Sequence, residues 1–179
     1  MKRDPNTVIF LAGFSGSGKT TVGKIIANLL GRRFFDLDRQ VELSSGLSVN
    51  ELIESQGERA FRRLESQRLR LLCRTVKVPA VVALGGGTLL SKSNQQLVKS
   101  HGRSMYLRCS QVELKRRLGK SRNRPLLGGT RSGISRARIK VLFDQRKSGY
   151  DRCDYWIPAA NLSAVAVARK VCEIIETTT

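Results

Sequence analysis

Residues 13–20 have the types and spacing needed to hold phosphate groups. They read GlyPheSerGlySerGlyLysThr and match the pattern GxxxxGKT. Glycine allows the tight turn in which backbone N–H groups surround a phosphate, Lys19 can reach the β and γ oxygens, and the Thr20 hydroxyl can bind Mg²⁺. This predicts a nucleoside triphosphate site that involves Gly13, Ser15, Gly16, Ser17, Gly18, Lys19, Thr20 and Thr21.

Two aspartates, Asp36 and Asp38, are candidates to supply the carboxylate that such a site needs beside the metal. The most apolar later run, 78–84, ends in glycines instead of an acid. Asp36 and Asp38 end a short strand-like run, 33–38, and residues two apart on an extended chain lie on one face. One acid could then address Mg²⁺ and the other a substrate hydroxyl.

Two further features are candidates for ligand binding, and the second of them suits a carboxylate. Three glycines, 85–87, follow the apolar run 78–84, where a parallel sheet binds ligands and glycine permits close approach to the backbone. Arg62 and Glu65 are three apart on a predicted helix, and a glutamate-held arginine is arranged to bind a carboxylate. Taken alone, such a pair is most often a surface ion pair.

Apolar runs and helical periodicity place these residues on alternating strands and helices, which indicates one α/β domain with a parallel sheet covered on both faces. The expected strands are 7–13, 33–38, 78–84, 104–109 and 155–157. The first expected helix begins at Lys19 and ends at Gly31, and the next occupies 49–76 with a break near Gly57. A further helix follows the three glycines and ends at about Lys99, and the remaining ones are 111–118, 135–150 and 163–175.

Composition excludes several classes of protein. The chain has 179 residues, 40% of them hydrophobic, so it can bury a core, and it has no apolar run long enough to span a bilayer. We reject a signal peptide at 1–13, because its short apolar run leads directly into the glycine loop. Four dispersed cysteines predict buried thiols in a reducing cytoplasm, and the single histidine, His101, excludes a serine–histidine triad.

The net charge of +19 is concentrated late in the chain. Between Glu113 and Asp144 there is no acidic residue but many cations, so the segment repels itself unless anions bind there. Charge alone does not choose between nucleic acid, nucleotide phosphates and an acidic small substrate. Residues 119–135, rich in glycine, serine and arginine, are expected to form a mobile loop or small lid.

Together these motifs resemble those of the shikimate kinase family in order and approximate spacing. Besides the phosphate loop, the match includes PheAspLeuAsp at 35–38, GlyGlu at 57–58, PheArgArgLeuGlu at 61–65, GlyGlyGly at 85–87, ArgProLeuLeu at 124–127 and ArgLysSerGlyTyr at 146–150. The resemblance implies a P-loop, nucleoside-monophosphate-kinase-like fold with a five-stranded parallel sheet. It also implies a single domain, 1–179, with a mobile lid at about 119–135 and a substrate-binding helical region at about 39–70.

The resemblance implies that the γ-phosphoryl of ATP moves to the 3-hydroxyl of shikimate, with Mg²⁺, in the chorismate pathway to aromatic amino acids. Carried over by position, Asp36 addresses the metal through water, Asp38 takes the substrate hydroxyls, and Lys19, Asp38 and Arg124 are catalytic. The other implied roles are carboxylate binding by Arg62 and Arg146, backbone contacts from Gly86 and Gly87, orientation of Arg62 by Glu65, adenine packing by Arg117 and phosphate contact by Arg124.

Two alternatives remain at this stage. One is another small-molecule kinase of the same fold, such as a gluconate-type kinase, although the Asp36 and Asp38 pair with Arg62 and Arg146 favours shikimate. The other is a nucleic-acid-binding P-loop protein, suggested by the basic segment and disfavoured because aromatic residues, needed for base stacking, make up only 6% of the chain. We expect a cytoplasmic monomer that binds shikimate and ATP and no membrane.

Overall fold

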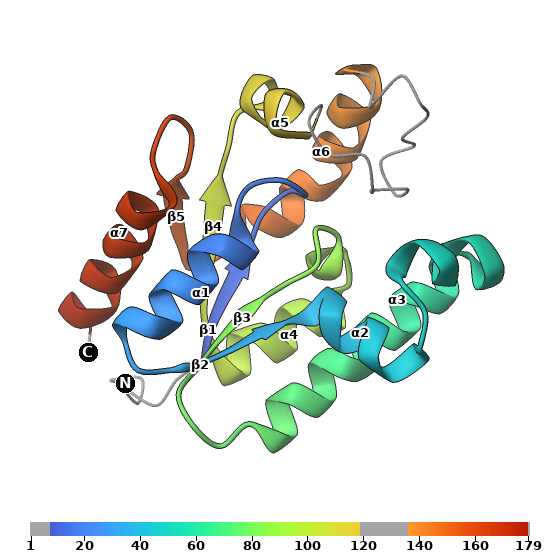
Figure 1. The fold of residues 1–179 in the computed structure, drawn as a ribbon, viewed down its shortest axis with the longest axis horizontal. Helices are drawn as coiled ribbons and strands as arrows, with labels where there is room; N and C mark the ends of the chain where they lie inside the picture. Colours follow the sequence, from blue (N-terminus) through green and yellow to red (C-terminus); the bar gives the residue numbers. More distant parts are fainter. Residues whose placement is uncertain (1–7, 119–135, 179) are drawn as a thin grey trace.

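A computed structural model describes residues 8–118 and 136–178, which form a central sheet with helices on both faces (Figure 1). The sheet has five strands in the order β2-β3-β1-β4-β5, and all neighbours are parallel. The five-stranded parallel sheet that the sequence predicts is therefore confirmed. Its strands are β1 (Val8–Ala12), β2 (Arg33–Asp36), β3 (Ala80–Ala83), β4 (Gly102–Arg108) and β5 (Tyr155–Pro158).

The helices divide between the two faces of the sheet. One hydrophobic core lies under α1 and α7, and a second lies under α3, α4 and α6. The helices are α1 (Lys19–Leu29), α2 (Leu37–Ser45), α3 (Val49–Thr75), α4 (Lys92–His101), α5 (Gln111–Leu118), α6 (Arg136–Tyr150) and α7 (Ala164–Thr177), with a 3-10 turn η1 (Thr88–Leu90).

Strand β1 is the centre of the sheet and is buried along its whole length. Its side chains alternate between the two cores, with Phe10 in one core and Ile9 and Leu11 in the other. A strand covered on both faces must be apolar at every position, which explains its unbroken hydrophobic sequence. Helix α1 packs closely on this strand and on β2, because a Cβ at Gly23 would lie 3.0 Å from Leu11 of β1 and 2.5 Å from Phe34 of β2.

The expected strand 33–38 is wrong at its end, because β2 stops at Asp36 and α2 begins at Leu37. Asp36 is the N-cap of α2, and its Oδ1 accepts a hydrogen bond from the Arg39 N–H at 3.4 Å. An N-cap carboxylate satisfies a backbone donor that the first helical turn leaves free. Asp36 and Asp38 therefore do not share the face of a strand, since Asp38 lies in the first turn of α2.

Helices α2 and α3 form a lobe beside the sheet (Figure 1). Val41, Leu52 and Phe61 make its small core. Helix α3 begins with a capping box between Ser48 and Glu51 and is interrupted at Gly57, whose φ of 82° and ψ of 161° are not helical. The predicted break near Gly57 is confirmed.

Other boundaries differ little from the predictions. His101 ends α4, and β4 begins directly after it at Gly102. The four cysteines are buried free thiols, as expected. The expected lid, 119–135, lies outside the described residues, and within the described part of the chain none of the helices is long and apolar enough to cross a membrane.

Candidate active site

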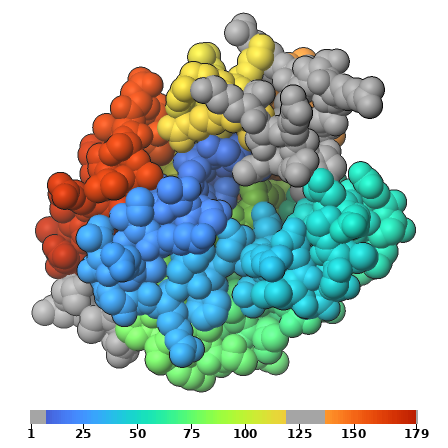
Figure 2. All heavy atoms as spheres, in the orientation of Figure 1, coloured from blue at the N-terminus to red at the C-terminus, as the bar shows by residue number. Residues whose placement is uncertain are grey.

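A cavity of about 880 Å³ opens at the carboxyl end of the sheet, between the glycine loop and the lobe of α2 and α3. Figure 2 shows this face of the molecule hollowed between α1 and that lobe. Ligands bind at this edge of open parallel sheets, because strand ends, loops and helix N-termini meet there. The cavity contains most of the residues that the sequence singles out.

The phosphate loop has the conformation that its glycines require. Gly16 and Gly18 have φ values of 85° and 98°, a region that glycine enters without strain. The Lys19 ammonium lies against the loop and donates to the carbonyls of Gly13 at 2.8 Å and Phe14 at 3.1 Å. Of the residues expected to bind ATP, Gly13 and Ser17 are buried beneath the others, while the cavity is lined by Ser15, Gly16, Gly18, Lys19, Thr20 and Thr21.

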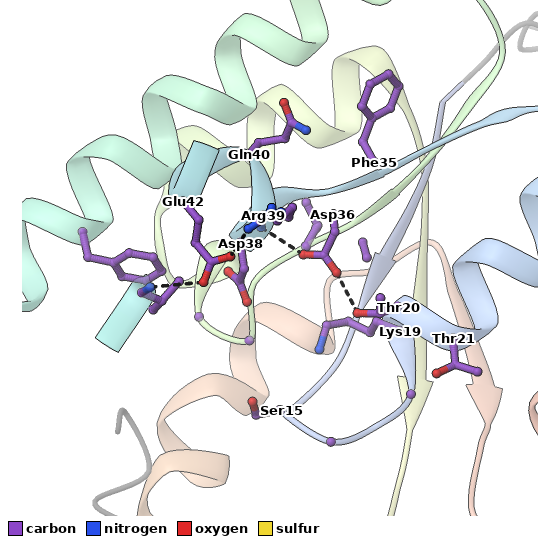
Figure 3. A pocket seen from close by; sticks show the side chains of 18 of the residues that line it. Ser15, Lys19, Thr20, Thr21, Phe35, Asp36, Asp38, Arg39, Gln40 and Glu42 are labelled. Atoms are coloured by element: carbon purple, nitrogen blue, oxygen red, sulfur yellow. Dashed lines mark hydrogen bonds and ion pairs between the residues drawn. The ribbon is translucent and has the colours of Figure 1, made fainter. Parts of the chain in front are cut away.

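Thr20 and Asp36 form an oxygen pair at the start of α1. The Thr20 hydroxyl donates to Asp36 Oδ2 at 2.7 Å (Figure 3). Oxygen donors suit a hard cation, and Mg²⁺ takes few protein ligands because it keeps water and substrate oxygens around it. The described residues contain no group of three or more histidine, cysteine or acidic side chains that could hold a metal ion.

Asp38 directs its carboxylate into the same cavity, on the side that Lys19 also faces (Figure 3). Its Oδ1 is buried and has no hydrogen-bond partner among the described residues. Burial, followed by the nearby carboxylates of Glu65 and Asp36, raises the pKa of Asp38 to about 6. An unpaired, basic carboxylate at this place can accept a proton or a hydrogen bond from a ligand hydroxyl.

Arg62 is fixed on the opposite wall by two glutamates. Its Nη1 donates to Glu65 Oε2 at 3.0 Å, and its Nη2 donates to Glu58 Oε1 at 3.0 Å. Glu65 is only 1% exposed and also accepts the Thr88 hydroxyl at 2.6 Å. The expected orientation of Arg62 by Glu65 is confirmed, and Thr88 holds Glu65 in turn.

Arg146 reaches the cavity from α6 and is 5% exposed. Its guanidinium lies over the Phe14 ring, 5.1 Å from the centroid, and hydrogen-bonds the Tyr150 hydroxyl. Burial lowers the pKa of Arg146, and the nearby Arg62 cation lowers it further. Two cations that repel each other across one cavity favour an anion between them.

Tyr150 supports this arrangement from behind. Burial raises the pKa of Tyr150 far above its usual value, and the protonated hydroxyl donates to the Gly86 carbonyl. The ring stacks on Tyr106 with centroids 4.9 Å apart, and Tyr106 meets the edge of Trp156 at 6.4 Å. The Tyr150 side chain thus links helix α6 to the glycine loop 85–87.

The glycines 85–87 leave no room for side chains. A Cβ at Gly86 would lie 3.1 Å from Arg146 Nη1, and one at Gly87 would lie 2.6 Å from Arg62 Nη2. A Cβ at Gly85 would collide with Glu65 Oε1 at 2.2 Å. Close approach explains the three glycines, because the loop runs directly between the groups that face the cavity.

Arg117, expected beside adenine, connects the phosphate loop to the segment that follows β5. Its Nη1 donates to the Ser17 carbonyl at 3.4 Å and its Nη2 to the Ala159 carbonyl at 3.2 Å. Glu113 accepts from Arg117 Nε at 2.6 Å. Hydrogen bonds from Arg116 and Arg117 hold the pKa of Glu113 down to about 2.

Part of the basic segment is neutralised by its flanking acids. Arg116 and Arg117 pair with Glu113, and Lys140 pairs with Asp144. Self-repulsion is therefore relieved in part without an external anion, which weakens the nucleic-acid interpretation. Arg124 and the rest of 119–135 lie outside the described residues.

Sequence reasoning missed Glu58, Glu113, Thr88 and Tyr150. The first two precede their arginine partners by four residues, a spacing that could have been recognised. Thr88 and Tyr150 contact their partners 23 and 64 residues away, and no local pattern announces such contacts.

Comparisons with known proteins agree with this geometry. The shikimate kinase family model matches residues 15–176. A shikimate kinase of Chlorobaculum tepidum is 42% identical over 155 residues, which cover 83% of this chain and 80% of that protein. A solved shikimate kinase from Acinetobacter baumannii, in complex with shikimate, has a TM-score of 0.87 at 30% identity and covers 97% of this chain and 94% of that one.

A gluconokinase from Sinorhizobium meliloti gives a TM-score of 0.56 at 17% identity over 99% of both chains, a likeness of fold alone. The gluconate-type alternative thus shares the fold without a comparable sequence match. The family model matches most of the chain, and a relative 42% identical covers 83% of it, so this chain belongs to the shikimate kinase family.

Proposed function

We propose that this kinase transfers the γ-phosphoryl of ATP to the 3-hydroxyl of shikimate and gives shikimate 3-phosphate in the chorismate pathway. The observation that carries the proposal is that Arg62 and Arg146 share one cavity with Asp38 and the phosphate loop. A carboxylate between the arginines would place the ring hydroxyls of a hydroxylated carboxylic acid beside Asp38. The phosphoryl donor would lie on the phosphate loop, beside Lys19.

Each role follows from the environment of the side chain. Asp38 would accept the proton of the attacking hydroxyl, since its unpaired Oδ1 faces the cavity and its pKa is raised to about 6. Lys19 would leave the carbonyls of Gly13 and Phe14 for the phosphate oxygens, where it would stabilise the charge of the transition state. Gly86 and Gly87 would present backbone to the substrate at close range.

Thr20 and Asp36 fit Mg²⁺ in this proposal. Their hydroxyl and carboxylate oxygens lie 2.7 Å apart at the phosphate loop, which suits a hard cation that also uses water and phosphate oxygens. When bound, the metal would neutralise charge on the phosphates. Thr20 would bind the metal directly, and Asp36 would act through water.

The remaining predictions from the sequence are part of the same proposal. They are a single kinase domain over 1–179, a lid at about 119–135 whose Arg124 reaches the phosphates, a substrate-binding region at about 39–70, and adenine packing by Arg117. Contacts of Arg117 with the Ser17 and Ala159 carbonyls support a position at the nucleotide side. A cytoplasmic monomer stays a prediction.

A coupled assay of ADP release tests the substrate. Purified protein with MgATP should release ADP with shikimate and little with gluconate, because only a rigid ring can place its carboxylate and its hydroxyls at the two ends of this cavity. A shikimate analogue without the carboxylate should also be poor. Equal stimulation by shikimate and gluconate would reject the proposed acceptor while leaving the kinase fold untouched.

A further inference from the structure

A second cavity, of about 440 Å³, lies between the edge strand β2 and the C-terminal half of α3. Its cationic lining residues are Arg33, Arg68 and Lys77, and its apolar wall includes Phe35, Leu72 and Val76. The size falls within the range of small-molecule sites. None of the groups assigned to phosphate or carboxylate binding in the catalytic cavity lines it.

Arg68 is the strongest indication of a ligand there. The residue is partly buried, and its Nε is buried without a hydrogen-bond partner among the described residues. Most buried donors are paired, and an N–H group removed from water without an acceptor is destabilising. Its neighbours on α3 differ, since Arg62 has two glutamates and Arg70 is exposed to water. Arg68 therefore lacks the acceptor that its burial calls for.

The charge around Arg68 has one sign. Arg33 and Lys77 add two exposed cations, and the described residues that line the cavity include no aspartate or glutamate. The C-terminal end of α3 contributes only about half a negative charge through its free carbonyls. Three full positive charges outweigh it, so the cavity attracts anions.

The apolar wall narrows the class of ligand. Phe35 and Leu72 offer surface that a bare inorganic anion would leave uncovered, whereas a compact ring would pack on it. We propose that this cavity is a binding site for a small organic carboxylate with an apolar ring, whose carboxylate pairs with Arg68. This site goes beyond the proposed phosphoryl transfer and does not depend on it.

Two residues join this site to the catalytic cavity. Phe35 and Gln40 line both cavities, and Figure 3 shows their side chains pointing away from Asp36 and Asp38. Phe35 directly precedes Asp36, the N-cap of α2. A ring packed against Phe35 would therefore contact the segment that carries both acids.

Residue-resolved NMR can test the site with benzoate as the probe, on the full chain with MgADP on the phosphate loop. Benzoate should shift the backbone amides of residues 71–78 and of Phe35. Benzyl alcohol, which keeps the ring without the charge, and inorganic phosphate, which keeps charge without the ring, should both bind at least about tenfold more weakly. Equal binding of either control compound would overturn the assigned ligand class.

The matched variants are Arg68→Met and Arg70→Met. Both remove a guanidinium from α3, but Arg70 is exposed and does not line the cavity. Arg68→Met should weaken benzoate binding about tenfold or more, while Arg70→Met should leave it unchanged. Unchanged binding to Arg68→Met, or shifts confined to the surroundings of Arg62 and Arg146, would refute the site.

Thermal unfolding of both variants controls for folding. Arg68→Met should be as stable as the parent protein, because the buried Nε that it removes has no hydrogen-bond partner among the described residues. If this variant did not fold, the pair Arg33→Gln with Lys77→Gln gives the same comparison from exposed positions. Benzoate binding that survived loss of both surface cations without weakening would then reject the proposal.

Discussion

The two halves of the catalytic cavity are built in different ways. The phosphate half comes from one continuous segment, 13–20, and relies on backbone conformation at Gly16 and Gly18. The carboxylate half is assembled from side chains on α3, the loop 85–87 and α6, which are far apart in the sequence. The first half is therefore a local motif, whereas the second exists only in the folded protein.

This difference predicts different responses to mutation. In the phosphate half, Lys19 is the one cation that the segment 13–20 itself supplies. In the carboxylate half, Arg62 and Arg146 share one anion, and Glu65, Thr88 and Tyr150 hold them in place. Loss of Lys19 in the first half should therefore abolish most activity, whereas single substitutions in the second half should reduce it by different, smaller amounts.

Replacement of Lys19 by Met should have the largest effect. The ammonium stabilises charge that develops on phosphate oxygens, so its loss should lower kcat by about a thousandfold or more. Steady-state kinetics with MgATP and shikimate measures this, and circular dichroism checks the fold. Turnover within about tenfold of the parent protein would contradict the role of Lys19.

Replacement of Arg146 or Arg62 by Ala should raise the KM for shikimate about tenfold to a hundredfold, since a charge-assisted hydrogen bond is worth about 1.5–3 kcal/mol. The KM for ATP should change far less. Lysine at either position should rescue only in part, because a point charge cannot make the planar two-pronged contact. A shikimate analogue without the carboxylate should bind the parent protein and both alanine variants equally poorly, and any further loss would show that Arg146 contacts another group.

Asp38 should make the free energy of unfolding depend on pH, and its raised pKa sets the direction. Its pKa is about 6 in the folded protein against an ordinary 3.8, so the folded state loses stability as pH rises between these values. Asp38→Asn should therefore raise the free energy of unfolding by on the order of 2 kcal/mol at pH 8 and by nothing below about pH 4. Urea denaturation across pH measures this difference.

Ionisation of Asp38 lowers the stability of the protein but should favour its activity. Because only ionised Asp38 can accept the hydroxyl proton, kcat/KM for shikimate should fall as pH drops below about 6. Asp144→Asn is a suitable control, since Asp144 is exposed and, among the residues that the structure describes, forms its ion pair with Lys140. A stability gain of the same size and pH dependence in both variants would exclude burial of Asp38 as its cause.

Thr88→Val should have the smallest effect and tests the support behind Arg62. It removes the 2.6 Å hydrogen bond to buried Glu65 with little change in volume, which should cost about 1 kcal/mol of stability. The KM for shikimate should rise a few-fold while kcat stays nearly constant. Thr75→Val, at the exposed end of α3, should leave KM unchanged, and equal effects of the two variants would argue against a positioning role.

The sequence predicts most of this fold because each strand and helix carries its own pattern. The buried strands read as apolar runs, and Gly57 marks the break in α3. The error at 33–38 has a local cause, since Asp36 ends the strand by capping a helix and alternation alone does not show where a strand stops. The phosphate loop is predictable because its chemistry lies in contiguous residues.

The supporting residues could not be predicted for the opposite reason. Tyr150 and Thr88 act on groups 64 and 23 residues away, so their roles depend on tertiary packing. The expectation that Arg62 and Arg146 share one cavity came from resemblance to a family, because no rule of sequence spacing connects them. The unpaired Nε of Arg68 was likewise invisible, because burial of one nitrogen is decided by its neighbours in the fold.

The aromatic contacts behind α6 give the cavity an optical reporter. Trp156 is the sole tryptophan of the chain, and it meets Tyr106, which stacks on Tyr150, whose hydroxyl holds the Gly86 carbonyl. We expect displacement of Gly86 or Arg146 by a ligand to be transmitted through these two rings to the indole. Intrinsic fluorescence excited at the red edge of the absorption band, where tyrosine does not absorb, should then follow occupancy of the carboxylate half in the unlabelled protein.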